Sequence, residues 1–157
     1  MLSTVGPFLH TRFPKVGHIM KIEIDLSPAL EDQQIVQNGL RQHNDQYAPA
    51  DGDSAFAVFL RDPDGTVVGG VLARADRGWL RIGTLWVEAS LRGRGYGRQL
   101  MAAVEAEGRQ RGCHSAYLDT FSFQAPVFYE QRGYEVFGIL EAFPDEHTRF
   151  FMRKSLS

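Results

Sequence analysis

Residues 80–97 read LRIGTLWVEASLRGRGYG, and the rest of the chain can be placed around this segment. Two sets of residues alternate along its first half: Leu80, Ile82, Thr84 and Trp86, separated by Arg81, Gly83, Leu85 and Val87. This period of two predicts a strand over residues 80–87. After a short polar connector and a run of alternating arginine and glycine, residues 98–111 carry apolar side chains at helical spacing. The segment therefore predicts a strand, a glycine-rich turn and a long helix in succession.

The turn between this strand and this helix has the features of an anion-binding site. Glycine adopts positive φ angles, so a glycine-rich turn can direct several N–H groups toward one point. The first N–H groups of a helix have no partner within the helix, and the positive end of the helix dipole favours phosphate. Glycine and arginine alternate here as Arg92, Gly93, Arg94, Gly95, Tyr96, Gly97 and Arg98, with one tyrosine. The competing interpretation is a tight turn whose arginines are solvated.

Two common phosphate-binding motifs can be compared with this turn. A dinucleotide-binding loop has the pattern G-x-G-x-x-G, and counting from Gly93 its third glycine falls at Arg98. Asp119 nevertheless lies near the place expected for a ribose-binding acid, so a dinucleotide ligand remains an alternative. A Walker loop requires Gly-Lys followed by Ser or Thr, which the sequence lacks.

The pattern that fits is Arg or Gln, two residues of any type, Gly, any residue, and Gly or Ala. Arg92, Gly95 and Gly97 satisfy it, and it is accompanied by Leu85-Trp86-Val87 before it and by Phe128-Tyr129-Glu130 and Gly133-Tyr134 after it. In these features the chain resembles the acetyl-CoA-binding segment of the GNAT superfamily of N-acetyltransferases, over about residues 22–156. The resemblance implies an α/β fold with a mixed, mostly antiparallel central sheet of about seven strands flanked by helices. Two of its parallel strands would splay apart and form the cofactor cleft.

Local signals place the remaining elements. Strands are predicted over residues 22–26, 55–60, 67–73, 80–87, 115–119, 134–140 and 148–152, and helices over residues 28–43, 98–111 and 125–132. A loop is predicted at residues 49–53. Residues 1–19 lack periodicity and are expected to be a flexible N-terminal extension, and residues 20–157 are expected to form a single acetyltransferase domain.

Composition narrows the class of protein and its partners. The chain has 157 residues and a formal net charge of −2, which gives no general attraction to nucleic acid or to an anionic membrane. It has one cysteine, Cys113, so a disulfide framework is excluded and a reducing, cytoplasmic location is expected. No apolar stretch approaches the length of a membrane span, and the histidines show no metal-ligand spacing.

The resemblance implies a role for each part of the predicted coenzyme site, with acetyl-CoA as co-substrate. Backbone N–H groups of Leu85, Trp86 and Val87 would polarise the thioester carbonyl. The residues that would hold the diphosphate are Arg92, Gly93, Arg94, Gly95, Tyr96, Gly97 and Arg98. Gln124 would contact the pantetheine arm.

The resemblance also points to the residues that move protons. Tyr129 would donate its phenolic proton to the leaving thiolate. For the base that deprotonates the amine, Glu88 is the first choice because it ends the central strand, with Asp119 second and an ordered water as a further alternative.

The predicted function is N-acetyl transfer from acetyl-CoA to a primary amine by direct attack in a ternary complex. The acceptor would be a small molecule or a protein or peptide amine, and neither nucleic acid nor a membrane is an expected partner. A homodimer is a candidate assembly, because family members often pair. A non-catalytic acyl-CoA-binding or sensing module on the same fold is the alternative of a different class.

Overall fold

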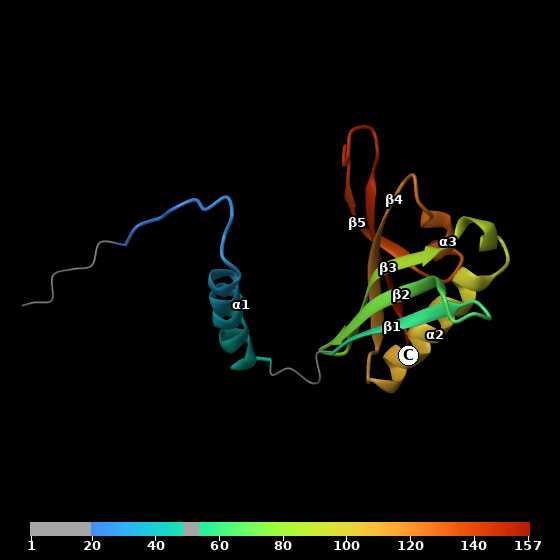
Figure 1. Ribbon diagram of the computed structural model, residues 1–157, viewed down its shortest axis with the longest axis horizontal. Helices are drawn as coiled ribbons and strands as arrows, with labels where there is room; N and C mark the ends of the chain where they lie inside the picture. The colour runs from blue at the N-terminus through green and yellow to red at the C-terminus, as the bar shows by residue number, and fades with distance from the viewer. Residues whose placement is uncertain (1–19, 49–53) are drawn as a thin grey trace, which may run out of the picture. The chain divides into compact units, whose positions relative to one another are not determined.

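The computed structural model describes residues 20–48 and 54–157 (Figure 1). The chain divides into two units, with the boundary between residues 40 and 41, and the described residues of each unit are treated separately. The predicted extension at residues 1–19 and the loop at residues 49–53 lie outside the described residues. A single domain over residues 20–157 stays a prediction.

In the first unit, helix α1 (Leu30–Asp45) begins and continues into the second unit. Before it, the Ser27 N–H donates to Asp25 Oδ1 at 2.8 Å, a local turn that precedes the helix. The strand predicted over residues 22–26 is wrong: these residues are exposed and no strand is assigned to them. Alternation alone does not make a strand, because the backbone N–H and C=O groups must also find a neighbouring strand.

In the second unit, the described strands form one six-stranded sheet with the order β1-β2-β3-β4-β6-β5. The strands are β1 (Ser54–Arg61), β2 (Val67–Asp76), β3 (Trp79–Val87), β4 (Ser115–Phe121), β5 (Glu135–Leu140) and β6 (Arg149–Ser155). Among the described strand pairs, only β3–β4 is parallel. The sheet is therefore mixed and mostly antiparallel, as predicted. The expected count of about seven strands is one too high, since residues 22–26 do not contribute.

Helix α2 (Tyr96–Gln110) connects β3 to β4 and packs across β1, β2 and β3. Its buried side chains are Leu100, Met101, Val104 and Glu105, together with Gly108. A Cβ at Gly108 would lie 2.8 Å from the Leu80 side chain, so glycine permits the close approach of helix and strand. The helix begins two residues earlier than predicted. Helix α3 (Pro126–Glu130) and a short 3-10 turn, η1 (Ala89–Leu91), complete this part of the chain.

Strand β3 contains a bulge at Gly83. Leu72 of β2 pairs with Thr84 and Ala73 pairs with Ile82, so Gly83 is the extra residue on β3. Leu80 and Ile82 are buried before the bulge, whereas Leu85 and Val87 pack against the core after it. The alternation read from the sequence is therefore interrupted at Gly83, and Trp86 is 48% exposed.

Strands β3 and β4 separate after their first half. Their parallel pairing joins Trp79–Ile82 to Ser115–Leu118, and from there β4 continues in pairing with β6. The second half of β3 pairs with β2 on its other edge. This separation confirms the predicted pair of splayed parallel strands. None of the helices in the described ranges is both long enough and apolar enough to cross a membrane.

Candidate active site

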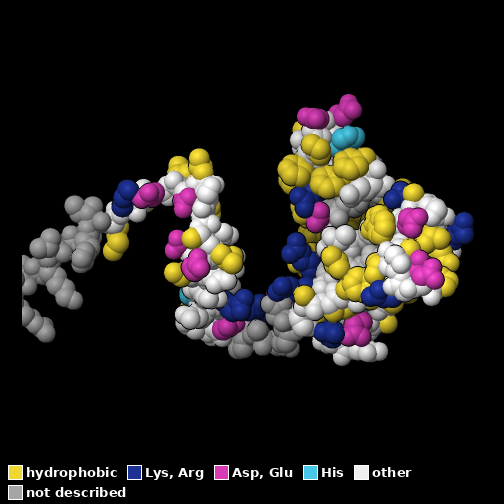
Figure 2. Space-filling model, in the orientation of Figure 1, with side chains coloured by type: hydrophobic (Ala, Val, Ile, Leu, Met, Phe, Trp, Pro, Cys, Tyr) yellow, Lys and Arg dark blue, Asp and Glu magenta, His cyan; other side chains and the backbone are white. Residues whose placement is uncertain are grey.

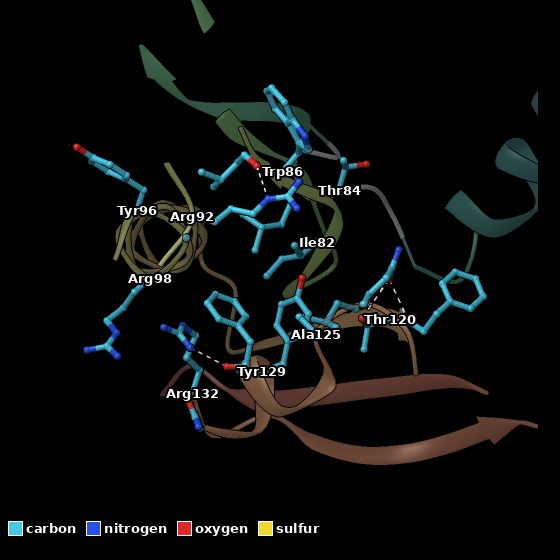
Figure 3. Close-up of a pocket in the computed structure, with 18 of the residues that line it drawn as sticks. Ile82, Thr84, Trp86, Arg92, Tyr96, Arg98, Thr120, Ala125, Tyr129 and Arg132 are labelled. Atoms are coloured by element: carbon cyan, nitrogen blue, oxygen red, sulfur yellow. Dashed lines mark hydrogen bonds between the residues drawn. The ribbon is translucent and has the colours of Figure 1, made fainter. Parts of the chain in front are cut away.

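A cavity of about 900 Å³ lies where β3 and β4 separate, between the start of α2 and helix α3. Figure 3 shows Tyr96 and Arg98 at one end of it and Thr84 and Thr120 at the opposite end. The predicted coenzyme residues that line it are Leu85, Trp86, Val87, Arg92, Gly93, Gly95, Tyr96, Gly97, Arg98 and Gln124. In the described part of the chain, Arg94 is the predicted coenzyme residue that does not line it.

The glycine-rich turn leaves the start of α2 open. Gly93 and Gly95 have φ angles of +74° and +85°, and a Cβ built on either would have no atom within 4 Å. Gly95 is the N-cap of α2 and has no side chain to cap the helix, and the N–H of Gln99 donates to its carbonyl at 3.1 Å. Within the described residues, the N–H groups of the first turn are thus left for a ligand, which fits a bound phosphate.

Arginines surround this open helix end, in different ways. The Arg92 Nε donates to the Val87 carbonyl at 2.9 Å and so ties the turn to the end of β3 (Figure 3). Arg98 lines the cavity from the first turn of α2. Arg132, which follows α3, lies with its guanidinium 3.7 Å from the centre of the Phe128 ring and donates to the Phe128 carbonyl at 2.6 Å. Burial, and then the nearby positive charge of Arg98, lower the pKa of Arg132.

Tyr129 lines the cavity from the short helix α3, in which it directly follows Phe128. Its ring is 9% exposed and makes edge contacts with Phe128 and Tyr134, at centroid distances of 5.1 and 6.0 Å. Burial raises the pKa of the Tyr129 phenol, so the hydroxyl keeps its proton. The cavity therefore contains a protonated donor held by packing.

Gln124 is oriented by the end of β4. Its side-chain carbonyl accepts from the Thr120 hydroxyl and from the Phe121 N–H, each at 3.1 Å. These bonds fix the amide plane and leave the Nε2 group available to a ligand. This is compatible with the predicted contact to an extended, polar coenzyme arm.

The two candidate bases lie in different surroundings. Glu88 follows β3 but is not one of the described residues that line the cavity, and its carboxylate accepts from the Ser90 hydroxyl at 2.9 Å. Asp119 does line the cavity, and its Oδ2 accepts from Arg149 Nε and Nη2 at 2.8 and 2.7 Å. The Oδ2 atom of Asp119 is therefore already engaged by the Arg149 guanidinium.

Several cavity residues were not predicted from the sequence, among them Thr120, Phe121, Phe123 and Arg132. Arg132 could have been found, because it follows Phe128 by four residues, the spacing of neighbours on a helix. Phe121 and Phe123 carried no such signal, since their position depends on how β4 ends and the chain turns into α3.

Comparisons with known proteins agree with this architecture. Residues 19–134 match the model of the acetyltransferase (GNAT) family. The chain is 33% identical over 102 residues to a blasticidin-S acetyltransferase of Streptomyces morookaense, a match that covers 64% of this chain and 75% of that protein. It is 39% identical over 83 residues to the acetyltransferase Atu2258 of Agrobacterium fabrum, covering 53% of this chain and 61% of that one.

A solved structure agrees as well. An acetyltransferase of Bacillus cereus superposes with a TM-score of 0.80 at 30% identity, over 87% of this chain and 97% of that one. The family match covers well over half of the chain and includes the strand, the glycine-rich turn and the helix that surround the cavity. The chain therefore belongs to the acetyltransferase (GNAT) family and is an acyltransferase of the GNAT type.

Proposed function

We propose that the protein transfers the acetyl group of acetyl-CoA to the primary amine of a small molecule, by direct attack within a ternary complex. The observation that carries this proposal is the convergence of three features on one cavity. These are the open start of α2, the separated strands β3 and β4, and the buried Tyr129 hydroxyl.

The residues at the glycine-rich turn suit the coenzyme. Acetyl-CoA supplies a thioester at the end of a long arm whose other end carries a diphosphate. The N–H groups around Gly95 and Gly97 would bind the diphosphate, with Arg98 beside them. Arg92 holds the turn in place through the Val87 carbonyl, so its contribution includes the shape of the site.

The separated half of β3 suits the carbonyl. Backbone N–H groups of Leu85, Trp86 and Val87 lie along the cavity, beyond the last residue pair with β4. Any of these groups that points away from β2 would donate to the carbonyl oxygen as negative charge develops on it. Donors of this type contribute about 10²–10³ in rate.

Proton transfers complete the reaction. As the amine nitrogen bonds to the acetyl carbon, the carbon–sulfur bond breaks and the thiolate receives the phenolic proton of Tyr129. The proton released by the amine would pass to Glu88, to Asp119 or to an ordered water. Asp119 lines the cavity but accepts hydrogen bonds from Arg149, whereas Glu88 accepts from the Ser90 hydroxyl but is not one of the described residues that line the cavity. The variants Glu88→Gln and Asp119→Asn distinguish the two carboxylates. Only removal of the true base should lower kcat at neutral pH, and this decrease in kcat should become smaller at higher pH, where more of the amine is already deprotonated.

The small-molecule acceptor is supported by the name of one relative. The Streptomyces morookaense protein is described as a blasticidin-S acetyltransferase, so a protein of this sequence group acts on a small molecule. Mixing the purified protein with acetyl-CoA and a panel of amines, and measuring the free thiol released, tests the proposal. Thiol release that requires both an amine and Tyr129 supports it. Tight CoA binding without thiol release for any amine would instead indicate a non-catalytic acyl-CoA-binding protein.

A further inference from the structure

Three phenylalanine rings form a stack beside the cavity. Phe121 lies against Phe123 with centroids 5.1 Å apart and planes inclined by 12°, and against Phe143 at 6.1 Å and 10°. We call these three rings the aromatic stack. Phe121 ends β4, Phe123 lies in the loop before α3, and Phe143 lies in the hairpin between β5 and β6. Figure 2 shows apolar side chains gathered with a histidine at this hairpin, and His147 makes an edge contact with Phe123 at 4.8 Å.

The outer rings of the aromatic stack are exposed, whereas the side chains of a hydrophobic core are buried. Phe123 is 55% exposed and Phe143 is 44% exposed. A stack that served only to join the hairpin to β4 would gain most from burying both outer rings. Exposed apolar rings grouped at the edge of a cavity are typical of a ligand-binding surface.

The aromatic stack lies toward the acceptor end of the cavity. Phe121 and Phe123 both line the cavity, and Phe121 follows Thr120, which lies opposite the end marked by Tyr96 and Arg98 (Figure 3). The exposed Trp86 on β3 contributes to the wall of the same cavity. If the coenzyme diphosphate is at the α2 end, this far end is where an acceptor would enter.

The charge near these rings restricts the acceptor. The Arg149 guanidinium lies 5.3 Å from the centre of Phe121 and 5.4 Å from the centre of Phe143, and it is paired with Asp119. The negative faces of these rings thus already attract a cation, and the nearby carboxylate is already paired. A flexible polycation would gain little here, whereas a flat, uncharged ring would stack on the rings that remain exposed.

We propose that the aromatic stack, with Trp86, binds an acceptor whose amine is carried by a flat aromatic or heteroaromatic ring. This assignment rests on the proposed function, because it places the acceptor in relation to the coenzyme. It makes Phe123 a specificity-determining residue.

Binding measured without turnover tests this acceptor site. The full-length protein, in the presence of CoA, is titrated by calorimetry with phenethylamine and with cyclohexylethylamine, which carries the same aminoethyl chain on a puckered ring. Phenethylamine is expected to bind roughly two- to tenfold more tightly. Spermidine, a flexible polyamine, is expected to bind more weakly than either. Equal or tighter binding of cyclohexylethylamine or spermidine would overturn the proposal.

A pair of matched variants locates the effect. Phe123→Leu keeps an apolar side chain but removes the flat ring, and it is expected to abolish the preference for phenethylamine without altering CoA binding. Phe137→Leu is the control, because Phe137 lies on β5, is 53% exposed, and is not one of the described residues that line the cavity. A preference that survives Phe123→Leu, or is lost equally in Phe137→Leu, would contradict the proposal.

The two proposals fail in different ways. Ring-selective binding without acetyl transfer to any amine would support the acceptor site and contradict the proposed function. Acetyl transfer without ring selectivity would support the proposed function and overturn the acceptor site.

Discussion

Ile82 of β3 and Leu118 of β4 form the last residue pair that joins these two parallel strands. Both side chains are buried in the core, so the strands are held together up to this point and separate directly after it. Gly83, the bulged residue, is the next residue of β3. The cavity opens at the place where the strand pairing ends, which explains why the proposed reaction centre lies there and not at the sheet edge.

Replacing Tyr129 with phenylalanine tests the proposed proton donor. The ring and its packing against Phe128 and Tyr134 remain, so only the hydroxyl is lost. We expect kcat to fall by about 10²–10⁴ with little change in the KM for acetyl-CoA. Steady-state kinetics on the best amine of the panel measures this. Tyr117→Phe is the control, since Tyr117 lies on β4 outside the set of described cavity-lining residues, and an equal loss there would contradict the assignment.

Burial of Tyr129 gives a prediction for the pH dependence of the rate. Its pKa is raised above the ordinary value of 10.0, because burial disfavours the phenolate. The protonated, donating form therefore persists at pH values where an exposed tyrosine would ionise. We expect kcat to show no alkaline decline that can be assigned to this phenol up to about pH 10. The contradicting result is a decline of the wild-type kcat near pH 9 that the residual activity of Tyr129→Phe does not show. Burial would then not keep the Tyr129 phenol protonated.

The pair Gly95 and Gly65 separates coenzyme binding from backbone strain. Both have a φ of +85°, and a Cβ at either position would have no atom within 4 Å, but Gly95 caps α2 whereas Gly65 lies in the turn between β1 and β2. Replacing either by alanine is expected to cost about 1–3 kcal/mol of unfolding free energy, measured by urea denaturation. Only Gly95→Ala should also weaken CoA binding in calorimetry. Equal weakening by Gly65→Ala would mean that the loss comes from general destabilisation.

Arg92 and Arg94 flank Gly93 and differ in their contacts. Both are exposed, but Arg92 lines the cavity and donates through Nε to the Val87 carbonyl, whereas Arg94 is not one of the described residues that line the cavity. Lysine keeps the charge but cannot reproduce the guanidinium geometry. We therefore expect Arg92→Lys to raise the KM for acetyl-CoA and Arg94→Lys to leave it unchanged. An unchanged KM in Arg92→Lys would show that charge, rather than the guanidinium contact that anchors the turn, determines coenzyme binding.

Tyr134 predicts how stability changes at high pH. Its hydroxyl donates to the buried Glu105 carboxylate at 3.0 Å, and burial, followed by the charge of Glu105, raises its pKa. The folded state therefore holds this proton more tightly than the unfolded state, so the stabilisation is complete below the ordinary pKa of 10.0 and decreases as the pH rises above it.

At neutral pH, Tyr134→Phe is expected to lower the unfolding free energy by about 1.5–3 kcal/mol, the contribution of a hydrogen bond to a charged group. The difference between the wild type and the variant should shrink above pH 10.0. Urea denaturation across this range measures it, and a difference that stays constant would contradict the raised pKa.

The elements that could be predicted from the sequence are those with a local cause. The alternation in β3, the glycine-rich turn and the apolar face of α2 predict the strand, turn and helix that line one side of the cavity. The bulge at Gly83 could not be predicted, because it appears only in the register between β2 and β3. Residues 22–26 show the opposite error, since their alternation predicts a strand that finds no partner among the described residues.

The same distinction applies to the site. Ten of the eleven predicted coenzyme residues line the cavity, because one continuous motif and its neighbours contribute most of them. Phe123, in a loop, lines the cavity, and Arg149, on β6, contacts the cavity residues Phe121 and Asp119; both positions depend on tertiary contacts, so nothing in the local sequence marks them. The position of Glu88 after β3 predicts a place at the cavity, but the chain turns at η1 and its carboxylate faces Ser90 instead.

A crystal structure of the protein with bound CoA would locate both ends of the coenzyme. We expect diphosphate oxygens about 2.7–3.2 Å from backbone N–H groups at Gly95 and Gly97, and the CoA sulfur beside the Tyr129 hydroxyl, between β3 and β4. A diphosphate bound away from the start of α2, or a CoA arm that does not pass between the two strands, would contradict this expectation.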